Sequence, residues 1–174
     1  MLKKIIKKSV NFFGYSIIPK EFYDFYSAQN LDKIHRSLFK LKTKKLIIFD
    51  VGANRGQSII RFRKIFSQSY IHCFEPIPEN YRYIQKNYKN DKTIMNNCAI
   101  GEKNGIKKFF INESSGTSSF FPINKKSNWA KKKKSNRTVR NENVRVITLD
   151  SYFKKNKIKK IDILKIDVQG FEDK

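Results

Sequence analysis

The feature that most constrains the fold is a short apolar run that leads directly into a glycine-containing turn. Residues 47–56 read IIFDVGANRG, so the apolar run ends at Val51 and the turn contains Gly52 and Gly56. The apolar residues are continuous rather than alternating, which is typical of a strand buried on both faces of a parallel sheet. A glycine after such a strand lets the backbone turn sharply and approach a ligand closely. The segment therefore predicts a strand, a tight turn and the start of a helix.

The same alternation of strand and helix continues along the chain, which predicts an α/β fold with a parallel sheet and helices on both faces. The long polar stretch over residues 112–143 is expected to be a loop. A short helix through Phe153 is expected to be capped by Asp150. We predict the remaining helices over residues 57–66 and from Pro78 to Tyr88, and the strands over residues 46–51, 70–75, 93–100, 107–111, 144–149 and 161–168.

A carboxylate follows the second predicted strand. In an open α/β sheet, ligands bind at the carboxyl ends of the strands. The helix after Gly56 offers unpaired N–H groups to an anionic group, but two glycines in this pattern match neither GxGxxG nor a P-loop. Glu75 closes the second strand in the sequence CFEP, and a carboxylate there can accept hydrogen bonds from both hydroxyls of a ribose. Although a glutamate at a strand end is common by itself, the combination of Glu75 with the glycine-containing turn after the first strand predicts an adenosine-type ligand.

Six segments of the chain form an ordered set of motifs: DVGANRG (50–56), FEP (74–76), NCAIG (97–101), SSGTSS (114–119), VITLD (146–150) and ILKIDVQGFE (163–172). In this order they resemble the FkbM family of S-adenosylmethionine-dependent methyltransferases. The resemblance covers about residues 46–172 and implies a Rossmann-like methyltransferase fold with S-adenosylmethionine as cofactor. It suggests methylation of a hydroxyl on a sugar, a glycan or another small-molecule acceptor.

The resemblance also implies which residues hold the cofactor. Glu75 would hold the ribose hydroxyls. The residues implied next to the adenine are Asn97, Cys98 and Ala99. The residues implied around the methionine portion of the cofactor are Asp50, Gly52, Ala53, Asn54 and Gly56.

Two acidic residues are the catalytic candidates. Asp167, at the end of the last predicted strand, would face the sulfonium and the acceptor, and Glu172 is the second candidate. A positioned base assists transfer to a hydroxyl. Lys165 lies on the same face of the strand as Asp167, which favours an ionised carboxylate over a strong base. The alternatives are that Asp167 only orients backbone N–H groups and that Glu172 caps a helix.

The first 45 residues differ from the rest. Within residues 1–18 the apolar side chains fall on one arc of a helical wheel and the lysines on the opposite arc. We expect residues 1–45 to form a basic amphipathic helical extension and residues 46–174 to form the FkbM-like domain. The extension suits peripheral contact with the anionic inner face of a membrane, and the alternative is a helix docked on its own domain. No run of about 18 apolar residues occurs, so a cytoplasmic protein is expected.

The chain carries 38 Lys and Arg against 15 Asp and Glu, a net charge of +23. This balance excludes an acidic-tail protein and brings nucleic acid into consideration as a partner. A basic patch with aromatic side chains suits RNA, and the lysine run Lys131–Lys134 follows Phe120, Phe121 and Trp129. The alternative for the lysine run is a solvated charged face. An RNA methyltransferase and a non-catalytic, basic module that binds a membrane or RNA therefore stay open. The same aromatic residues equally suit stacking on a sugar or anchoring the loop to the core.

The sequence ends soon after the last motif and supplies fewer strands than the usual methyltransferase sheet. We therefore expect a domain incomplete at its C-terminus, with an exposed apolar sheet edge. Three explanations stay open: a fragment of a longer protein, a truncated and inactive reading frame, or a partner that completes the sheet. Cys73 and Cys98 have no metal-ligand spacing and are expected to be reduced, buried thiols, with a disulfide as the alternative. His35 and His72 lack paired ligands, so no metal site is predicted.

Overall fold

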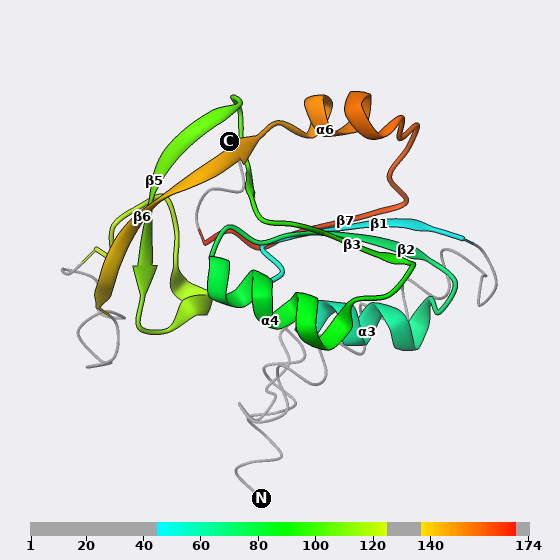
Figure 1. Ribbon diagram of the computed structural model, residues 1–174, viewed down its shortest axis with the longest axis horizontal. Helices are drawn as coiled ribbons and strands as arrows, with labels where there is room; N and C mark the ends of the chain where they lie inside the picture. The colour runs from blue at the N-terminus through cyan, green and yellow to red at the C-terminus, as the bar shows by residue number, and fades with distance from the viewer. Residues whose placement is uncertain (1–44, 125–136, 170–174) are drawn as a thin grey trace, which may run out of the picture. The chain divides into compact units, whose positions relative to one another are not determined.

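The computed structural model of the protein describes residues 45–124 and 137–169. All of them belong to one compact unit, Lys42–Lys174. Strands and helices alternate along most of this unit (Figure 1). In chain order the elements are β1 (Ile47–Val51), α3 (Gln57–Ile65), β2 (Tyr70–Phe74), α4 (Pro78–Tyr88), β3 (Thr93–Asn96), β4 (Ala99–Ile100), β5 (Gly105–Asn112), the 3-10 helix η1 (Ser115–Thr117), β6 (Thr138–Ile147), α6 (Leu149–Asn156) and β7 (Ile163–Ile166).

The larger sheet is parallel throughout and has the strand order β3-β2-β1-β7. Because β1 lies between β2 and β7, Asp50 pairs with Cys73 on one side and with Lys165 on the other. Helices α3 and α4 cover one face of this sheet, and α6 lies over the other (Figure 1). The predicted α/β fold, a mostly parallel sheet flanked by helices, is confirmed.

Strand β1 is buried because helices cover both faces of its sheet. Ile48, Phe49 and Val51 are at most 2% exposed. The Phe49 ring stacks on His72 at a centroid distance of 4.9 Å and meets Tyr152 of α6 edge-on at 5.7 Å. His72 Nδ1 and Tyr152 Oη share a hydrogen bond of 2.8 Å. Burial lowers the pKa of His72 to about 4, so this histidine is a neutral residue of the core.

The prediction of one continuous strand over residues 93–100 is wrong. β3 ends at Asn96, and the next strand, β4, belongs to a different sheet. Between the two strands, the side-chain amide of Asn97 donates to the carbonyl oxygens of Glu75 (2.9 Å) and Pro76 (3.1 Å). These hydrogen bonds hold the chain at the end of β2 and redirect it out of the parallel sheet.

The second sheet has the order β4-β6-β5, with β6 parallel to β4 and antiparallel to β5. The strand expected over residues 107–111 is confirmed as β5. However, β6 begins at Thr138 rather than Val144, so residues 112–143 are not one long loop. The first half of β6 is exposed and polar because it pairs with β5 without entering the core. Such a strand lacks the apolar signal on which the prediction depended.

Helix α6 also departs from the prediction. Its N-cap is Thr148 rather than Asp150, since Thr148 Oγ1 accepts a hydrogen bond of 3.1 Å from the backbone N–H of Ser151. The helix continues to Asn156 instead of ending at Phe153. Both Thr and Asp are good N-cap residues, so composition could not separate them. The other predicted helices and strands lie within two residues of their predicted bounds.

Several further predictions concern the cysteines, metal binding and the segments outside the described ranges. Cys73 and Cys98 are free and buried, as predicted. Trp129, Lys131–Lys134 and residues 1–44 lie outside the described residues, so the predictions made for them stay predictions. Within the described part of the chain, no helix is long and apolar enough to cross a membrane. Within the same ranges, no group of three or more His, Cys, Asp or Glu side chains is arranged to hold a metal ion.

Candidate active site

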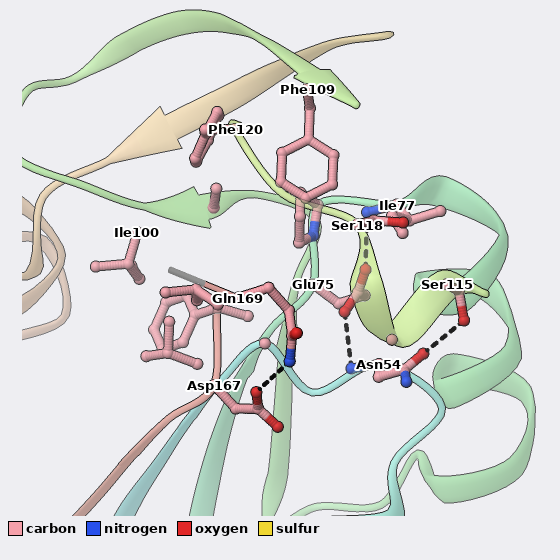
Figure 2. A pocket seen from close by; sticks show the side chains of 17 residues that line it. Asn54, Glu75, Ile77, Ile100, Phe109, Ser115, Ser118, Phe120, Asp167 and Gln169 are labelled. Atoms are coloured by element: carbon pink, nitrogen blue, oxygen red, sulfur yellow. Dashed lines mark hydrogen bonds between the residues drawn. The ribbon is translucent and has the colours of Figure 1, made fainter. Parts of the chain in front are cut away.

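A cavity opens at the carboxyl ends of β1, β2 and β7 (Figure 2). About 600 Å³ of open space lies within it, counting the solvent at its mouth. The turns after β1 and β2 and the residues after β7 form one side, and the second sheet and η1 contribute the other. This edge of an open α/β sheet is where ligands bind.

The turn after β1 brings the backbone close to the end of β7. Gly52 has a φ of +76°, and its N–H donates to the Phe74 carbonyl at 3.0 Å. A Cβ at this position would clash with the carbonyl oxygen of Asp167. Only glycine therefore allows the two strand ends to meet here. Gly56, with a φ of +83°, is the N-cap of α3; it is buried and does not line the cavity.

Glu75 ties together the two turns at the cavity. Its Oε2 accepts a hydrogen bond from the backbone N–H of Asn54 (2.7 Å), and its Oε1 accepts one from Ile77 (2.9 Å) (Figure 2). The residue is 4% exposed. Burial raises the pKa of Glu75 to about 7, against the lowering effect of these hydrogen bonds. Each carboxylate oxygen has acceptor capacity beyond its one backbone partner.

The orientation of the Asn54 amide is fixed by two donors. Asn54 Oδ1 accepts hydrogen bonds from Asn80 Nδ2 and from Ser115 Oγ, each of 3.0 Å. The Asn54 backbone is left-handed, with a φ of +49°. A Cβ at Gly116 would lie 3.3 Å from Asn54 Nδ2. With Oδ1 committed to the protein, Nδ2 is the part of this amide that can donate to a ligand in the cavity.

Asp50 lies beneath the turn rather than in the cavity wall. It is fully buried, and its Oδ1 is 3.1 Å from Lys165 Nζ. The same ammonium group donates to the carbonyl of Gly52 at 3.0 Å. Burial raises the pKa of Asp50, and the neighbouring Lys165 charge opposes that rise. The Asp50–Lys165 ion pair thus stabilises the turn after β1 through the hydrogen bond to the Gly52 carbonyl.

Asp167 projects into the cavity from the end of β7 (Figure 2). Its side chain is 55% exposed, and its Oδ2 lies 3.8 Å from Lys165 Nζ. Its Oδ1 accepts a hydrogen bond of 2.8 Å from Gln169 Nε2. A carboxylate is therefore presented to the cavity with a donor beside each oxygen.

The structure brings only part of the predicted site into the cavity. Ala53, at 2% exposure, is buried behind it together with Asp50 and Gly56. Asn97 and Cys98 line a separate hollow that also contains Tyr152. Glu172 lies outside the described residues. The predicted residues that do line the cavity are Gly52, Asn54, Glu75, Ala99 and Asp167.

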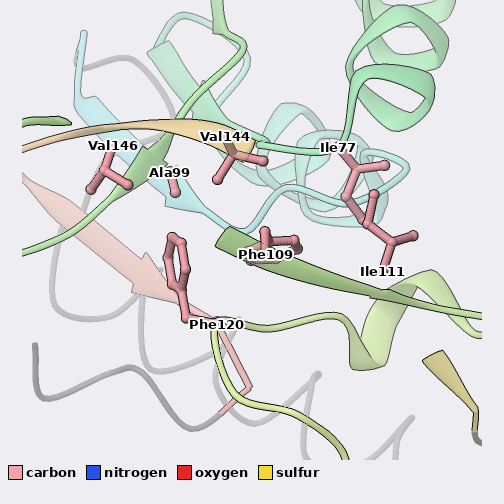
Figure 3. Packing of buried hydrophobic residues seen from close by; sticks show 7 residues of the cluster. All are labelled: Ile77, Ala99, Phe109, Ile111, Phe120, Val144 and Val146. Atoms are coloured by element: carbon pink, nitrogen blue, oxygen red, sulfur yellow. The ribbon is translucent and has the colours of Figure 1, made fainter. Parts of the chain in front are cut away.

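Several cavity residues were not assigned a role from the sequence. Three of them, Ser115, Gly116 and Ser118, lie in the SSGTSS motif, which is the sequence signal that could have located them. Phe120 lines the cavity but packs edge-on against Phe109 at 5.0 Å in a buried cluster (Figure 3), so it anchors its segment to the core. The unassigned cavity residues include Ile77, Phe109, Ser115, Gly116, Ser118 and Gln169.

Comparison with known proteins gave one family match and a weak structural match. Residues 50–172 match the family model described as Methyltransferase FkbM domain. A similar solved structure is the plantazolicin methyltransferase BpumL in complex with a triazolic desmethylPZN analogue and SAH. That match has 14% identity and a TM-score of 0.35, and it covers 66% of this chain. This chain spans about half of that protein, 54% of its length. No curated protein matches the sequence.

Proposed function

The chain belongs to the FkbM family of methyltransferases, and from that premise we propose that it transfers a methyl group from S-adenosylmethionine to a hydroxyl of a sugar, a glycan or another small-molecule acceptor. The family expected from the sequence motifs is thereby confirmed. The observation that carries the proposed activity is the Glu75 carboxylate, held in the wall of a cavity at the carboxyl ends of the parallel strands. The acceptor class rests on the family resemblance.

The cavity residues suit this cofactor. The Glu75 oxygens have acceptor capacity for the two ribose hydroxyls. Ile77 and Ala99 supply an apolar wall for the adenine ring, and Asn54 Nδ2 supplies a donor for an anionic group such as the methionine carboxylate. Gly52 keeps the backbone close without a Cβ. When bound, S-adenosylmethionine supplies a methyl group already activated on a positively charged sulfur.

The protein's own contribution is alignment and exclusion of water. Asp167 lines the cavity, and its carboxylate can accept a hydrogen bond from the hydroxyl that is to be methylated. This hydrogen bond orients the hydroxyl oxygen, and the carboxylate receives the hydroxyl proton as the new carbon–oxygen bond forms. Phe109 and Phe120 close the opposite side with apolar surface. Holding the acceptor oxygen in line with the transferred carbon is the largest contribution expected from a site of this kind.

The test is a calorimetric titration of the chain with S-adenosylhomocysteine. We expect saturable binding by the unmodified protein and at least about a tenfold loss of affinity in Glu75→Ala, because hydrogen bonds to a charged group are removed. Glu79→Ala is the matched control, since this exposed glutamate on α4 forms ion pairs with Arg82 and Arg140 at the surface and does not line the cavity. Equal affinity in Glu75→Ala and the unmodified chain would contradict the proposal.

A further inference from the structure

The two carboxylate oxygens of Asp167 are held by different groups. Gln169 Nε2 donates to Oδ1 at 2.8 Å, and Lys165 Nζ lies 3.8 Å from Oδ2. The amide fixes the rotation of the carboxylate, and the ammonium group draws the other oxygen toward β1. Because an ionised carboxylate has acceptor sites in excess of these two contacts, it remains able to accept a hydrogen bond from a ligand.

The backbone of Gln169 adopts a conformation that non-glycine residues rarely take. Its φ is +57°, in the left-handed region. The carbonyl oxygen of Gln169 accepts a hydrogen bond of 3.0 Å from Ser119 Oγ, in the segment between η1 and β6. Such conformations persist where the surroundings hold them, and they concentrate at functional sites. Here the contact that holds the backbone comes from the opposite side of the cavity.

Both ends of this contact are rigid. Ser119 is 4% exposed, and its backbone exchanges two hydrogen bonds with Phe110 of β5, of 2.8 and 3.2 Å. On the other side, the Asp167 N–H donates to the Val51 carbonyl at 3.0 Å. Val168 packs against two buried clusters, one that includes Phe109 and one that includes Phe49. Each of the three residues 167–169 is therefore held by a different contact. Asp167, the first of them, lines the cavity.

From this geometry we propose that Gln169 and Ser119 are positioning residues, which aim the Asp167 carboxylate at the place where the methyl group is transferred. This inference rests on the proposed function. A negative charge fixed at that place stabilises positive charge on the transferred group, and it costs no reorganisation at the moment of reaction. Ser119 acts through the Gln169 backbone, and Gln169 acts through its amide.

Two cofactor analogues test this arrangement without an acceptor. S-Adenosylhomocysteine carries nothing in place of the transferred methyl group, whereas sinefungin carries an ammonium group there. We expect the unmodified chain to bind sinefungin more tightly. In Asp167→Asn the ratio of sinefungin affinity to S-adenosylhomocysteine affinity should fall about tenfold, in Gln169→Leu about three- to tenfold, and in Ser119→Ala about two- to threefold. Calorimetric titrations of the full chain measure all of these ratios.

A matched control comes from the same segment. Thr117→Ala removes a hydroxyl that donates to the Ser114 carbonyl at 2.8 Å, and Thr117 does not line the cavity, so this variant should leave the ratio unchanged. Gln169→Asn keeps an amide donor and tolerates the left-handed backbone, and it should retain more of the ratio than Gln169→Leu. Circular dichroism verifies that each variant is folded.

The remaining outcomes are decisive. If Gln169→Leu weakens both ligands equally, or changes neither, the residue does not position Asp167 and the inference is overturned. An unchanged ratio in Asp167→Asn would also overturn it, because the carboxylate would then face another part of the cofactor. If the unmodified chain binds neither analogue, the proposed function itself fails, and this result is distinguishable from the other two.

Discussion

The parallel sheet and the second sheet reach their folds from different kinds of sequence. In β1 every residue after Ile47 is buried, because helices cover both faces of its sheet. In β5 the first four residues are exposed, and burial begins only at Phe109. One strand is therefore specified by its own apolar content, and the other by the partner with which it pairs. The cavity lies between these two regions, and Phe109, which the second sheet contributes to it, belongs to the buried end of β5.

The largest expected difference concerns aromatic residues at the centre of each region. Phe49→Ala should lower the free energy of unfolding by about 3–5 kcal/mol, because its fully enclosed site cannot collapse. Phe109→Ala should cost about 2–3 kcal/mol, because the second sheet can relax toward solvent on its open face. Urea unfolding followed by circular dichroism measures both values. Equal losses would break the comparison, because the site of Phe109 would then be as unable to collapse as the site of Phe49.

A smaller difference is expected between two arginines. Arg63 of α3 donates to the carbonyls of Ser69 and Lys92, each at 2.6 Å, and to Thr93 Oγ1 at 2.7 Å. Arg63→Met would leave these acceptors without their donor, so we expect a loss of about 2 kcal/mol. Arg140→Met on β6 removes exposed ion pairs with Glu142 and with Glu79, the latter at 2.8 Å, and should cost less than about 1 kcal/mol.

The same unfolding measurements test this second contrast. In 1 M salt the loss in free energy of unfolding caused by Arg140→Met should become smaller, because exposed ion pairs are screened. The loss caused by Arg63→Met should stay nearly unchanged. A loss for Arg140→Met as large as that for Arg63→Met would indicate that the second sheet depends on its ion pairs.

The smallest expected effect concerns the pH dependence of Glu75, which lines the cavity between the parallel sheet and the second sheet. Burial raises the pKa of Glu75 from 4.5 to about 7. Since the ionised carboxylate is the better acceptor for ribose hydroxyls, affinity for S-adenosylhomocysteine should rise about tenfold or less between pH 6 and 8. In the absence of ligand the sign is opposite: the folded protein binds more protons at Glu75 than the unfolded chain, so this residue makes stability fall as pH rises from 4.5 to 7.

Glu75→Gln separates these contributions from those of other groups. Its affinity should be lower and independent of pH over this range, and the difference in stability between the two proteins should show the expected slope. Calorimetry and urea unfolding, each repeated across the pH range, supply the two curves. A pH-dependent affinity that persists in Glu75→Gln would assign the effect to a different residue.

The sequence was most informative where a local pattern carried the physical signal. The continuous apolar run before Gly52 located β1, and the strand-end position of Glu75 located the cavity edge. The break after Asn96 could not be predicted, because it depends on an amide of Asn97 that reaches the end of another strand. The start of β6 at Thr138 was missed for a similar reason, since its polar residues are ordered by pairing with β5.

The same distinction between local patterns and long-range contacts applies to the residues of the candidate site. Asn54 and Asp167 were found because they stand inside motifs at strand ends. Lys165 was recognised beside Asp167, but its bond to the Gly52 carbonyl arises only when β1 and β7 pair. Gln169 and Ser119 are 50 residues apart, and nothing local links them. Cavity residues that stand inside a sequence motif are thus easier to find than contacts between distant segments such as Ser119 and Gln169.

The two buried thiols have a consequence for chemical labelling. Thiolate is the nucleophilic form of cysteine, and burial raises the pKa of Cys73 above its ordinary range and that of Cys98 to about 11. An alkylating reagent therefore reaches either sulfur only after the surrounding structure has opened. Because Cys73 lies within β2 and Cys98 lies between β3 and β4, the chain carries one natural reporter inside the parallel sheet and another where the chain crosses between the two sheets.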